Sequence, residues 1–121
     1  MKPAVVRPDL DAEFYTPERC HILEMSNTPD DPAMSIARAR VEPGVTTAFH
    51  HVLATAERYV ILEGSGLVEL GDMEPEQVAV GDVVLIPADV TQRITNTGNN
   101  DLVFLALCTP RFEPQNYIST E

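Results

Sequence analysis

The sequence predicts an all-β fold, a jelly-roll-like barrel of about nine short antiparallel strands. Ten prolines and six glycines, with clusters of Asn, Asp and Thr, interrupt the chain roughly every eight to twelve residues, as in an antiparallel all-β domain. No long stretch shows the periodicity of an amphipathic helix. Short strands without crossover helices favour two sheets that enclose one mixed core and leave an open mouth for a ligand cavity.

The chain is expected to begin with an extended arm over residues 1–20, with one short helical turn around residues 17–19. The predicted strands then cover 21–26, 33–41, 46–52, 57–63, 67–70, 77–80, 83–87, 92–96 and 102–108. Residues 33–108 would form the barrel, and residues 110–121 an irregular tail. We expect one domain over residues 1–121, because a chain of this length can bury roughly two thirds of its unfolded surface.

The breaks between the predicted strands carry the residues that tight turns need. Glycine supplies positive φ, proline fixes φ, and Asn and Asp bond to their own backbone. Such residues occupy 27–32, 42–44, 64–66, 71–72, 81–82 and 97–101.

The net charge of the chain argues against some classes of binding partner. Nineteen acidic residues against eight basic ones give a formal charge of −11. This charge repels phosphate backbones and anionic lipid headgroups, so no nucleic-acid or membrane partner is expected. No apolar run approaches the roughly 20 residues that cross a bilayer, and the first residues lack the apolar core of a signal peptide. The sequence predicts a cytoplasmic protein, with Cys20 and Cys108 as free thiols and Cys108 as a small buried hydrophobe.

One block of the sequence combines turn glycines with two groups that can do chemistry. Gly44 is followed after five residues by His50, then by Glu57, and after six more residues by Gly64. This spacing puts one imidazole and one carboxylate on neighbouring strands. A second block, residues 81–96, repeats the order of turn glycine, apolar strand, proline and polar residues.

Together the two blocks resemble the two motifs of the cupin family, which carry three histidines, one glutamate and turn glycines at this spacing. Seven positions are in register, namely Gly44, His50, Glu57, Gly64, Gly81, Pro87 and Asn96. The resemblance covers residues 44–96, and the flanking strands 33–41 and 102–108 suit the same barrel. It implies the double-stranded β-helix fold of a small cupin.

Three positions depart from the cupin pattern. Val52 stands where the second histidine would be, Asp89 where the second-motif glycine would be, and Gln92 where the third histidine would be. Successive side chains of a strand point to opposite faces, so His51 replaces the missing histidine only if a β-bulge turns the strand. The inner site is therefore expected to contain His50, Glu57 and Gln92.

This set leaves two chemistries open. His50, Glu57 and Gln92 could hold a divalent Fe, Mn, Ni or Zn ion weakly, because the amide oxygen of glutamine is a poor third ligand. Without a metal, His50 and Glu57 would form a hydrogen-bonded pair in a partly polar cavity, completed by Gln92, and that pair is also a general acid/base arrangement. No organic cofactor is expected.

Three further side chains are candidates for the site. Tyr59 shares a face with Glu57 and either donates a proton in catalysis or only lines the barrel. Arg38 and Arg40 alternate along one strand. If they face inward, they bind a substrate carboxylate, whereas outward-facing they form a solvated or dimer-facing pair.

The resemblance implies a protein that binds a small polar or anionic metabolite in the barrel. It is compatible with a metal-dependent or acid/base enzyme of the dioxygenase, isomerase, lyase or decarboxylase class. The alternative is a non-catalytic binding or sensor module that uses the same cavity, which the two lost histidines favour. Apolar residues on both faces of strands 57–63 and 83–87 predict a homodimer that buries one sheet face, unless the N-terminal arm covers it.

Overall fold

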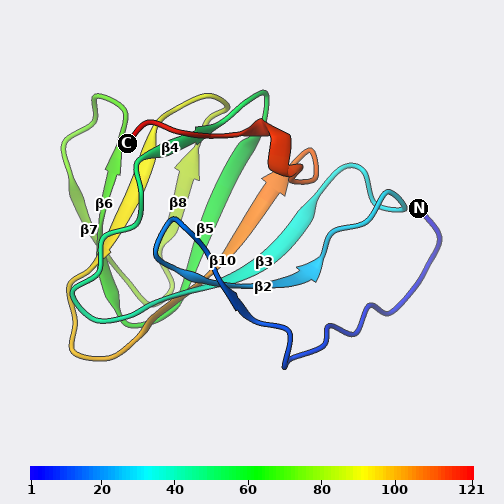
Figure 1. Ribbon diagram of the computed structural model, residues 1–121, viewed down its shortest axis with the longest axis horizontal. Coiled ribbons are helices and arrows are strands. Elements are labelled where there is room, and N and C mark those ends of the chain that lie inside the picture. The colour runs from blue at the N-terminus through cyan, green and yellow to red at the C-terminus, as the bar shows by residue number, and fades with distance from the viewer.

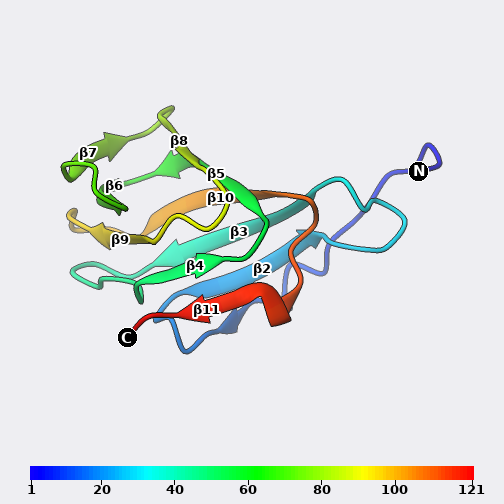
Figure 2. The same ribbon diagram turned by 90° about the horizontal axis from the view of Figure 1, so that it is seen from above.

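The computed structural model describes residues 1–121 as two antiparallel sheets that face each other (Figures 1 and 2). The six-stranded sheet has the order β1 (Phe14–Tyr15), β2 (His21–Ser26), β3 (Ser35–Val41), β10 (Leu102–Thr109), β5 (Ala56–Glu63), β8 (Val83–Ile86). The five-stranded sheet has the order β11 (Tyr117–Ser119), β4 (His50–Val52), β9 (Gln92–Asn96), β6 (Ser65–Leu70), β7 (Glu76–Ala79). The predicted all-β class is confirmed, although the two sheets do not close into a continuous barrel.

The structure differs from the predicted elements in the strand expected over 46–52, of which only His50–Val52 forms β4, and in the terminal segments. The arm contributes β1, and the tail contributes the 3₁₀ helix η1 (Pro114–Asn116) and β11. The prediction of a helical turn around residues 17–19 is wrong. There the chain makes a hairpin turn between β1 and β2, closed by a bond from Thr16 N to the Cys20 carbonyl at 2.9 Å. Arg19 takes the positive φ of 71° that the turn needs. None of the helical segments has the length and apolar character that a membrane span requires.

The core lies between the sheets and follows the alternation of the strands. Inward-facing side chains of the six-stranded sheet form rows across β3, β10 and β5. One row joins Val41 to Leu102, and the next aligns Ala39, Phe104 and Ile61. All five are at most 3% exposed. Opposite them, the five-stranded sheet contributes Val68, Leu70, Val78 and Ile94. This end of the sandwich is closed by large apolar side chains.

Further along the same strands the inward positions become small or polar. The third row aligns Ala37, Ala106 and Tyr59, and the fourth aligns Ser35, Cys108 and Glu57. These rows supply less side-chain volume than the first two, so the sheets are not filled at this end. The interior is unfilled at this end because the inward-facing residues of β3, β5 and β10 are small or polar here.

Two residues in register with the cupin pattern, one from each block, have structural roles at the closed end. Asn96 is 1% exposed, and its amide donates to the carbonyls of Val41 and Asn100, both at 2.8 Å. Gly64 has a φ of +82°, and a Cβ there would lie 2.8 Å from the Asp101 carbonyl oxygen. Only glycine fits that backbone without strain.

Candidate functional site

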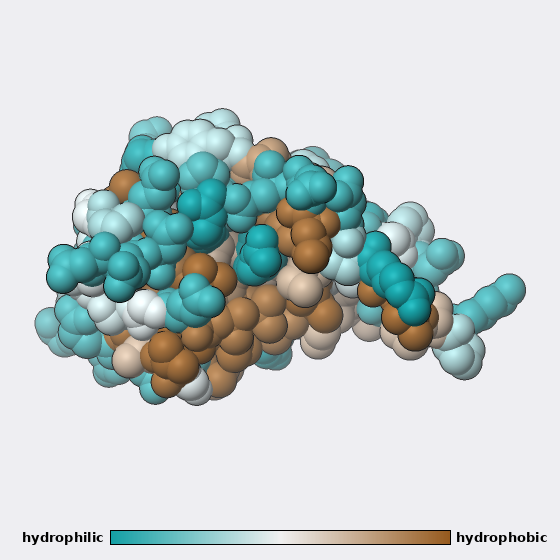
Figure 3. Space-filling view, turned by 90° about the horizontal axis from the view of Figure 1, so that it is seen from below, coloured by the Kyte–Doolittle hydropathy of each residue, from teal (hydrophilic) through white to brown (hydrophobic).

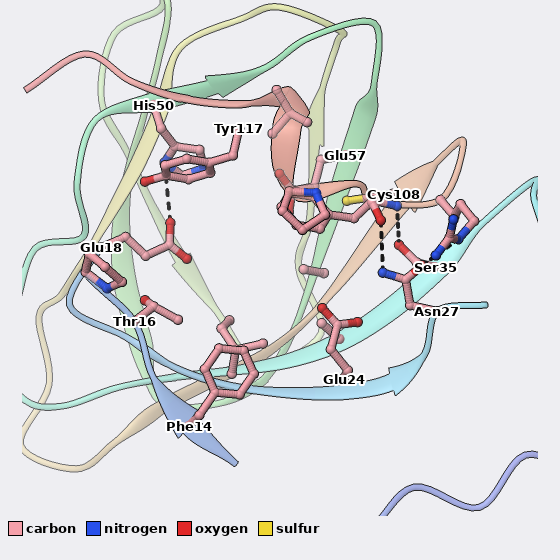
Figure 4. Close-up of a pocket in the computed structure, with 18 residues that line it drawn as sticks. Phe14, Thr16, Glu18, Glu24, Asn27, Ser35, His50, Glu57, Cys108 and Tyr117 are labelled. Atoms are coloured by element: carbon pink, nitrogen blue, oxygen red, sulfur yellow. Dashed lines mark hydrogen bonds and ion pairs between the residues drawn. The ribbon is translucent and has the colours of Figure 1, made fainter. Parts of the chain in front are cut away.

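A cavity of about 720 Å³ lies between the sheets at their open end. Figure 4 shows its walls, which come from β1, β2, β3, β5 and β10 on one side and from β4, η1 and β11 on the other. Its aromatic and aliphatic lining includes Phe14, Ile22, Val52, Phe112 and Pro114. Its polar lining includes Glu18, Glu24, Asn27, Ser35, His50, Glu57, Cys108, Arg111 and Tyr117. A mostly apolar wall with a few polar groups is the usual composition of a small-molecule site.

Glu57 is the buried carboxyl group of this cavity. It enters from β5 in the same row as Cys108 and Ser35, and its Oε1 has no hydrogen-bond partner in the protein. Burial raises the pKa of Glu57 to about 7, Glu18 adds to the rise, and Gln92 and Cys108 act in the opposite direction. A carboxyl group with this pKa can both give and take a proton near neutral pH.

His50 faces the cavity from β4 and is 6% exposed. Its Nδ1 lies 2.8 Å from the Ala48 carbonyl oxygen. A carbonyl oxygen only accepts, so Nδ1 carries the hydrogen and Nε2 is the acceptor of the neutral ring. The ring stacks on Tyr117 at 4.7 Å between centroids, and Glu18 Oε2 lies 3.6 Å from Nδ1 (Figure 4). These contacts fix the orientation of the imidazole.

The alternation of β4 decides which neighbours of His50 share its cavity. Val52 also lines the cavity, whereas half-buried His51 lies between them on the opposite face of the strand. No bulge turns this strand, so the position of the second motif histidine presents an isopropyl group.

Gln92 and Tyr59 lie behind the cavity wall. Gln92 is 1% exposed, pairs with His50 in the register of β9 and β4, and accepts a hydrogen bond from the Tyr59 hydroxyl through Oε1. Burial raises the pKa of Tyr59, so its hydroxyl keeps its proton. Tyr59 does border a smaller pocket of about 40 Å³, which also has Glu18, His50 and Glu57 on its wall. The pair is therefore placed to support Glu57 rather than to touch a ligand in the large cavity.

The donors present do not fit a three-ligand metal centre. No three side chains among His, Cys, Asp and Glu lie where they could hold an ion together. The Oε1 of Gln92 accepts the Tyr59 hydroxyl, and Nδ1 of His50 is held by a carbonyl group. Two free donors remain from the predicted set, one nitrogen of His50 and one oxygen of Glu57. Protein metal sites of this type use at least three ligands.

Arg38 and Arg40 lie outside the cavity. Their inward neighbours on β3 are Ala37 and Ala39, so alternation puts both arginines on the outer face of the sheet. Arg40 lies 2.6 Å from a Glu13 carboxylate oxygen, and Arg38 lies 3.6 Å from the other. The bond to Arg40 lowers the pKa of Glu13. The substrate-binding role predicted for the two arginines therefore has no support in the geometry, whereas the outward-facing alternative agrees with it.

Several cavity residues were missed from the sequence. Glu18 was assigned to the arm, Tyr117 to an irregular tail, and Glu24 and Arg111 were not selected. Glu18 and Tyr117 reach the cavity only because β1 and β11 extend the two sheets beside it. The adjacent aromatic residues Phe14 and Tyr15 were an available signal for β1, because aromatic residues are enriched in strands.

The sequence matches one family model and several known proteins. The family model described as "Cupin domain" matches residues 37–108. An uncharacterized protein of Methanocaldococcus jannaschii is 37% identical over 82 residues, which are 68% of this chain and 65% of that protein. The match thus spans about two thirds of the length of this relative. An oxalate-binding protein of Thermotoga maritima is 31% identical over 90 residues, covering 74% of this chain and 73% of that protein.

Solved structures show the same fold at lower sequence identity. Pac13 of Streptomyces, described as a nucleoside dehydratase, superposes with a TM-score of 0.80 at 13% identity, covering 98% of this chain and 92% of that one. KdgF of a Halomonas species superposes with a TM-score of 0.73 at 16% identity, covering 87% and 94%. At such identities the likeness concerns the fold alone.

Proposed function

The chain belongs to the cupin family, and we propose that its cavity binds a small polar metabolite and exchanges a proton with it through Glu57. The observation that carries this proposal is the unpartnered Oε1 of Glu57, a buried carboxyl group whose pKa is about 7, on the wall of a cavity of about 720 Å³. Burying a polar atom without a partner costs free energy, so such an atom marks a place where a ligand can supply the missing bond.

His50 has the complementary role in this proposal. With the hydrogen of the neutral ring on Nδ1, Nε2 is the atom that can accept a proton from the ligand. Glu57 in its protonated form can donate to a leaving group, and one base and one acid in the same cavity suit dehydration or isomerisation. Gln92 would position Glu57 through its side-chain hydrogen bond to that carboxyl group, and the Tyr59 hydroxyl would hold Gln92 in place.

The metal-dependent version of the function stays a separate prediction. With two free donors, any ion would be weakly held, and no step of the proposed proton transfer depends on it. Elemental analysis of protein purified without an affinity tag, beside a His50→Ala variant, tests this version. Stoichiometric metal that is lost in the variant would replace the acid/base proposal with a metal site.

Non-catalytic binding is the second candidate function, and the likeness to an oxalate-binding protein favours it. The cavity volume, however, lies in the range that encloses drug-sized ligands, so oxalate alone would leave most of it empty. A larger polar ligand suits the space better in either function.

A cavity-blocking variant and a charge-removing variant separate these functions. Ala37→Leu should abolish thermal stabilisation by any metabolite that binds the cavity, because Ala37 lines it. Metabolites that stabilise the wild type but not this variant are then incubated with the protein and followed by NMR. We expect conversion by the wild type and its loss in Glu57→Gln with binding retained. Binding without conversion would support the non-catalytic module, and equal conversion by Glu57→Gln would contradict the role of Glu57.

We also propose that two copies of the chain pair through the outer face of β5 and β8. On β8, Val83 and Leu85 are 56% and 67% exposed, and Leu62 on β5 is 41% exposed. Apolar surface gathers along one side of the molecule in Figure 3. Exposed apolar patches of this kind usually mark an interface. Light scattering should give the mass of a dimer for the wild type and of a monomer for Leu85→Lys, and a monomeric wild type would refute the pairing.

A further inference from the structure

The charges on the cavity wall are unbalanced toward negative. Glu18, Glu24 and Glu57 line it, against a single basic side chain, Arg111. The other seven of the eight Lys and Arg residues of the chain lie elsewhere. Arg111 is already engaged, because its Nε donates to Asn27 Oδ1 at 2.8 Å and its Nη1 lies 3.3 Å from Glu113 Oε1.

The cavity carboxylates differ from those outer carboxylates that bind an arginine. Outside the cavity, Glu13, Glu69 and Glu121 each form an ion pair with an arginine. Glu24 forms no ion pair, and the only basic group near Glu18 is the His50 ring at 3.6 Å. Neither Glu18 nor Glu24 is neutralised by a salt bridge to a lysine or an arginine, and Arg111 acts on Glu24 only through space.

Glu24 lines the cavity and is at the same time exposed to solvent. It stands on β2 opposite Ala37, and its side chain points into the cavity in Figure 4. Burial raises the pKa of Glu24, while Asn27 and Arg111 oppose that rise. Phe14 pairs with Ile22, two residues before Glu24 on β2, and is 52% exposed. Phe14, Phe112 and Tyr117 all line the cavity. Aromatic faces attract cations, and so does a carboxylate.

We propose that the natural ligand of this cavity carries a positively charged amino group, which Glu24 binds beside the aromatic ring of Phe14. This inference rests on the proposed function, because it names the class of ligand for the same site. An anionic ligand would instead be repelled by the cavity carboxylates and by the formal charge of −11 of the whole chain. The one guanidinium on the cavity wall, that of Arg111, is already bound to other side chains. The amino group at Glu24 would leave the rest of the ligand to reach His50 and Glu57.

Three probes of one size and different charge test the inference: tyramine, tyrosol and 4-hydroxyphenylacetate. Each is titrated into the ¹⁵N-labelled full chain, and dissociation constants are taken from the amide shifts of cavity residues such as Ala37 and Cys108. We expect tyramine to bind at least about tenfold more tightly than 4-hydroxyphenylacetate, with tyrosol between them.

Glu24→Gln should remove most of the preference for tyramine and leave the affinity for tyrosol unchanged. Glu76→Gln is the matched control, because it removes the same charge from an exposed position on β7 that does not line the cavity, and it should leave the preference intact. The dispersion of the amide spectrum shows whether each variant is folded.

The two proposals fail in distinguishable ways. If tyrosol or 4-hydroxyphenylacetate shifts the cavity amides and tyramine binds no better, the cavity remains a binding site and the inference about charge is overturned. If none of the three probes shifts the cavity amides, the proposed binding function itself fails and the inference fails with it. A preference for tyramine that Glu24→Gln leaves unchanged would overturn the role of Glu24.

Discussion

The two ends of the sandwich are built from the same strands and have opposite properties. On β10, Leu102 and Phe104 fill the closed end, whereas Cys108 borders the cavity. On β5, Ile61 is packed in the core, whereas Glu57 opens onto the cavity with one unpartnered oxygen. One pair of sheets thus holds a packed core at one end and an unfilled interior with a buried carboxyl group at the other. The division depends on alternate residues of three neighbouring strands.

Truncating a buried side chain at each end of the sandwich should give the largest difference in the free energy of unfolding. Phe104 is 3% exposed and packs on Tyr59 at 4.4 Å between ring centroids, so Phe104→Ala should lower the free energy of unfolding by about 3–5 kcal/mol. Cys108→Ala removes one atom beside an existing cavity and should cost less than about 1 kcal/mol. Urea denaturation of the two variants measures both values. Similar losses would show that the open end is packed as tightly as the closed end.

The second largest effect is expected in the pH dependence of the free energy of unfolding, which Glu57 at the open end should dominate. The pKa of Glu57 is about 7 in the folded chain against an ordinary value of 4.5, so the folded protein binds more protons between these values. Its stabilising contribution is complete below pH 4.5 and is lost as the pH rises through 7. The pKa difference corresponds to about 3 kcal/mol.

Comparison with Glu57→Gln isolates this contribution from that of other carboxyl groups. The free energy of unfolding of the wild type, minus that of the variant, should fall by about 3 kcal/mol between pH 4.5 and pH 8. Chemical denaturation at a series of pH values gives the difference. A difference that does not change with pH would mean that Glu57 ionises normally.

The smallest effect is expected on the outer face of the sheet. Arg40 bridges Glu13 and Asp101 at 2.6 and 3.1 Å but remains 29% exposed, so Arg40→Gln should cost at most about 1 kcal/mol. Tyrosol binding in the cavity should be unchanged, which NMR titration measures. Loss of that binding would mean that the outer arginine acts on the cavity.

Much of the fold was predictable from the sequence because turns and alternation are local signals. Strands 21–26 and 92–96 were predicted with the bounds that the structure has, since turn residues flank both. The closed end carries residues in register with the cupin pattern, such as Gly64 and Asn96, because backbone geometry there admits few alternatives. The two-residue β1 and the three-residue β11 are too short to give a periodic signal of their own.

The candidate site was predictable only in part, because its members come from distant segments. His50 and Glu57 were recognised by their spacing, and the structure brings both to one cavity. Glu18 and Tyr117 lie in segments whose place depends on pairing with β2 and β4, which the sequence of those segments alone does not specify. Arg38 and Arg40 alternate in the way that inward residues do, and only the register of β3 with β10 shows that they face outward.

Direct titration of Glu57 tests the central claim, that the open end holds a carboxyl group able to exchange protons near neutral pH. The side-chain ¹³C carboxyl resonance of Glu57, assigned by its absence from Glu57→Gln, can be followed by NMR from pH 3 to pH 9. We expect a midpoint of about 7, since burial raises the pKa of this group. A midpoint near 4.5 would contradict it, because Glu57 would then be an ordinary ionised carboxylate at neutral pH.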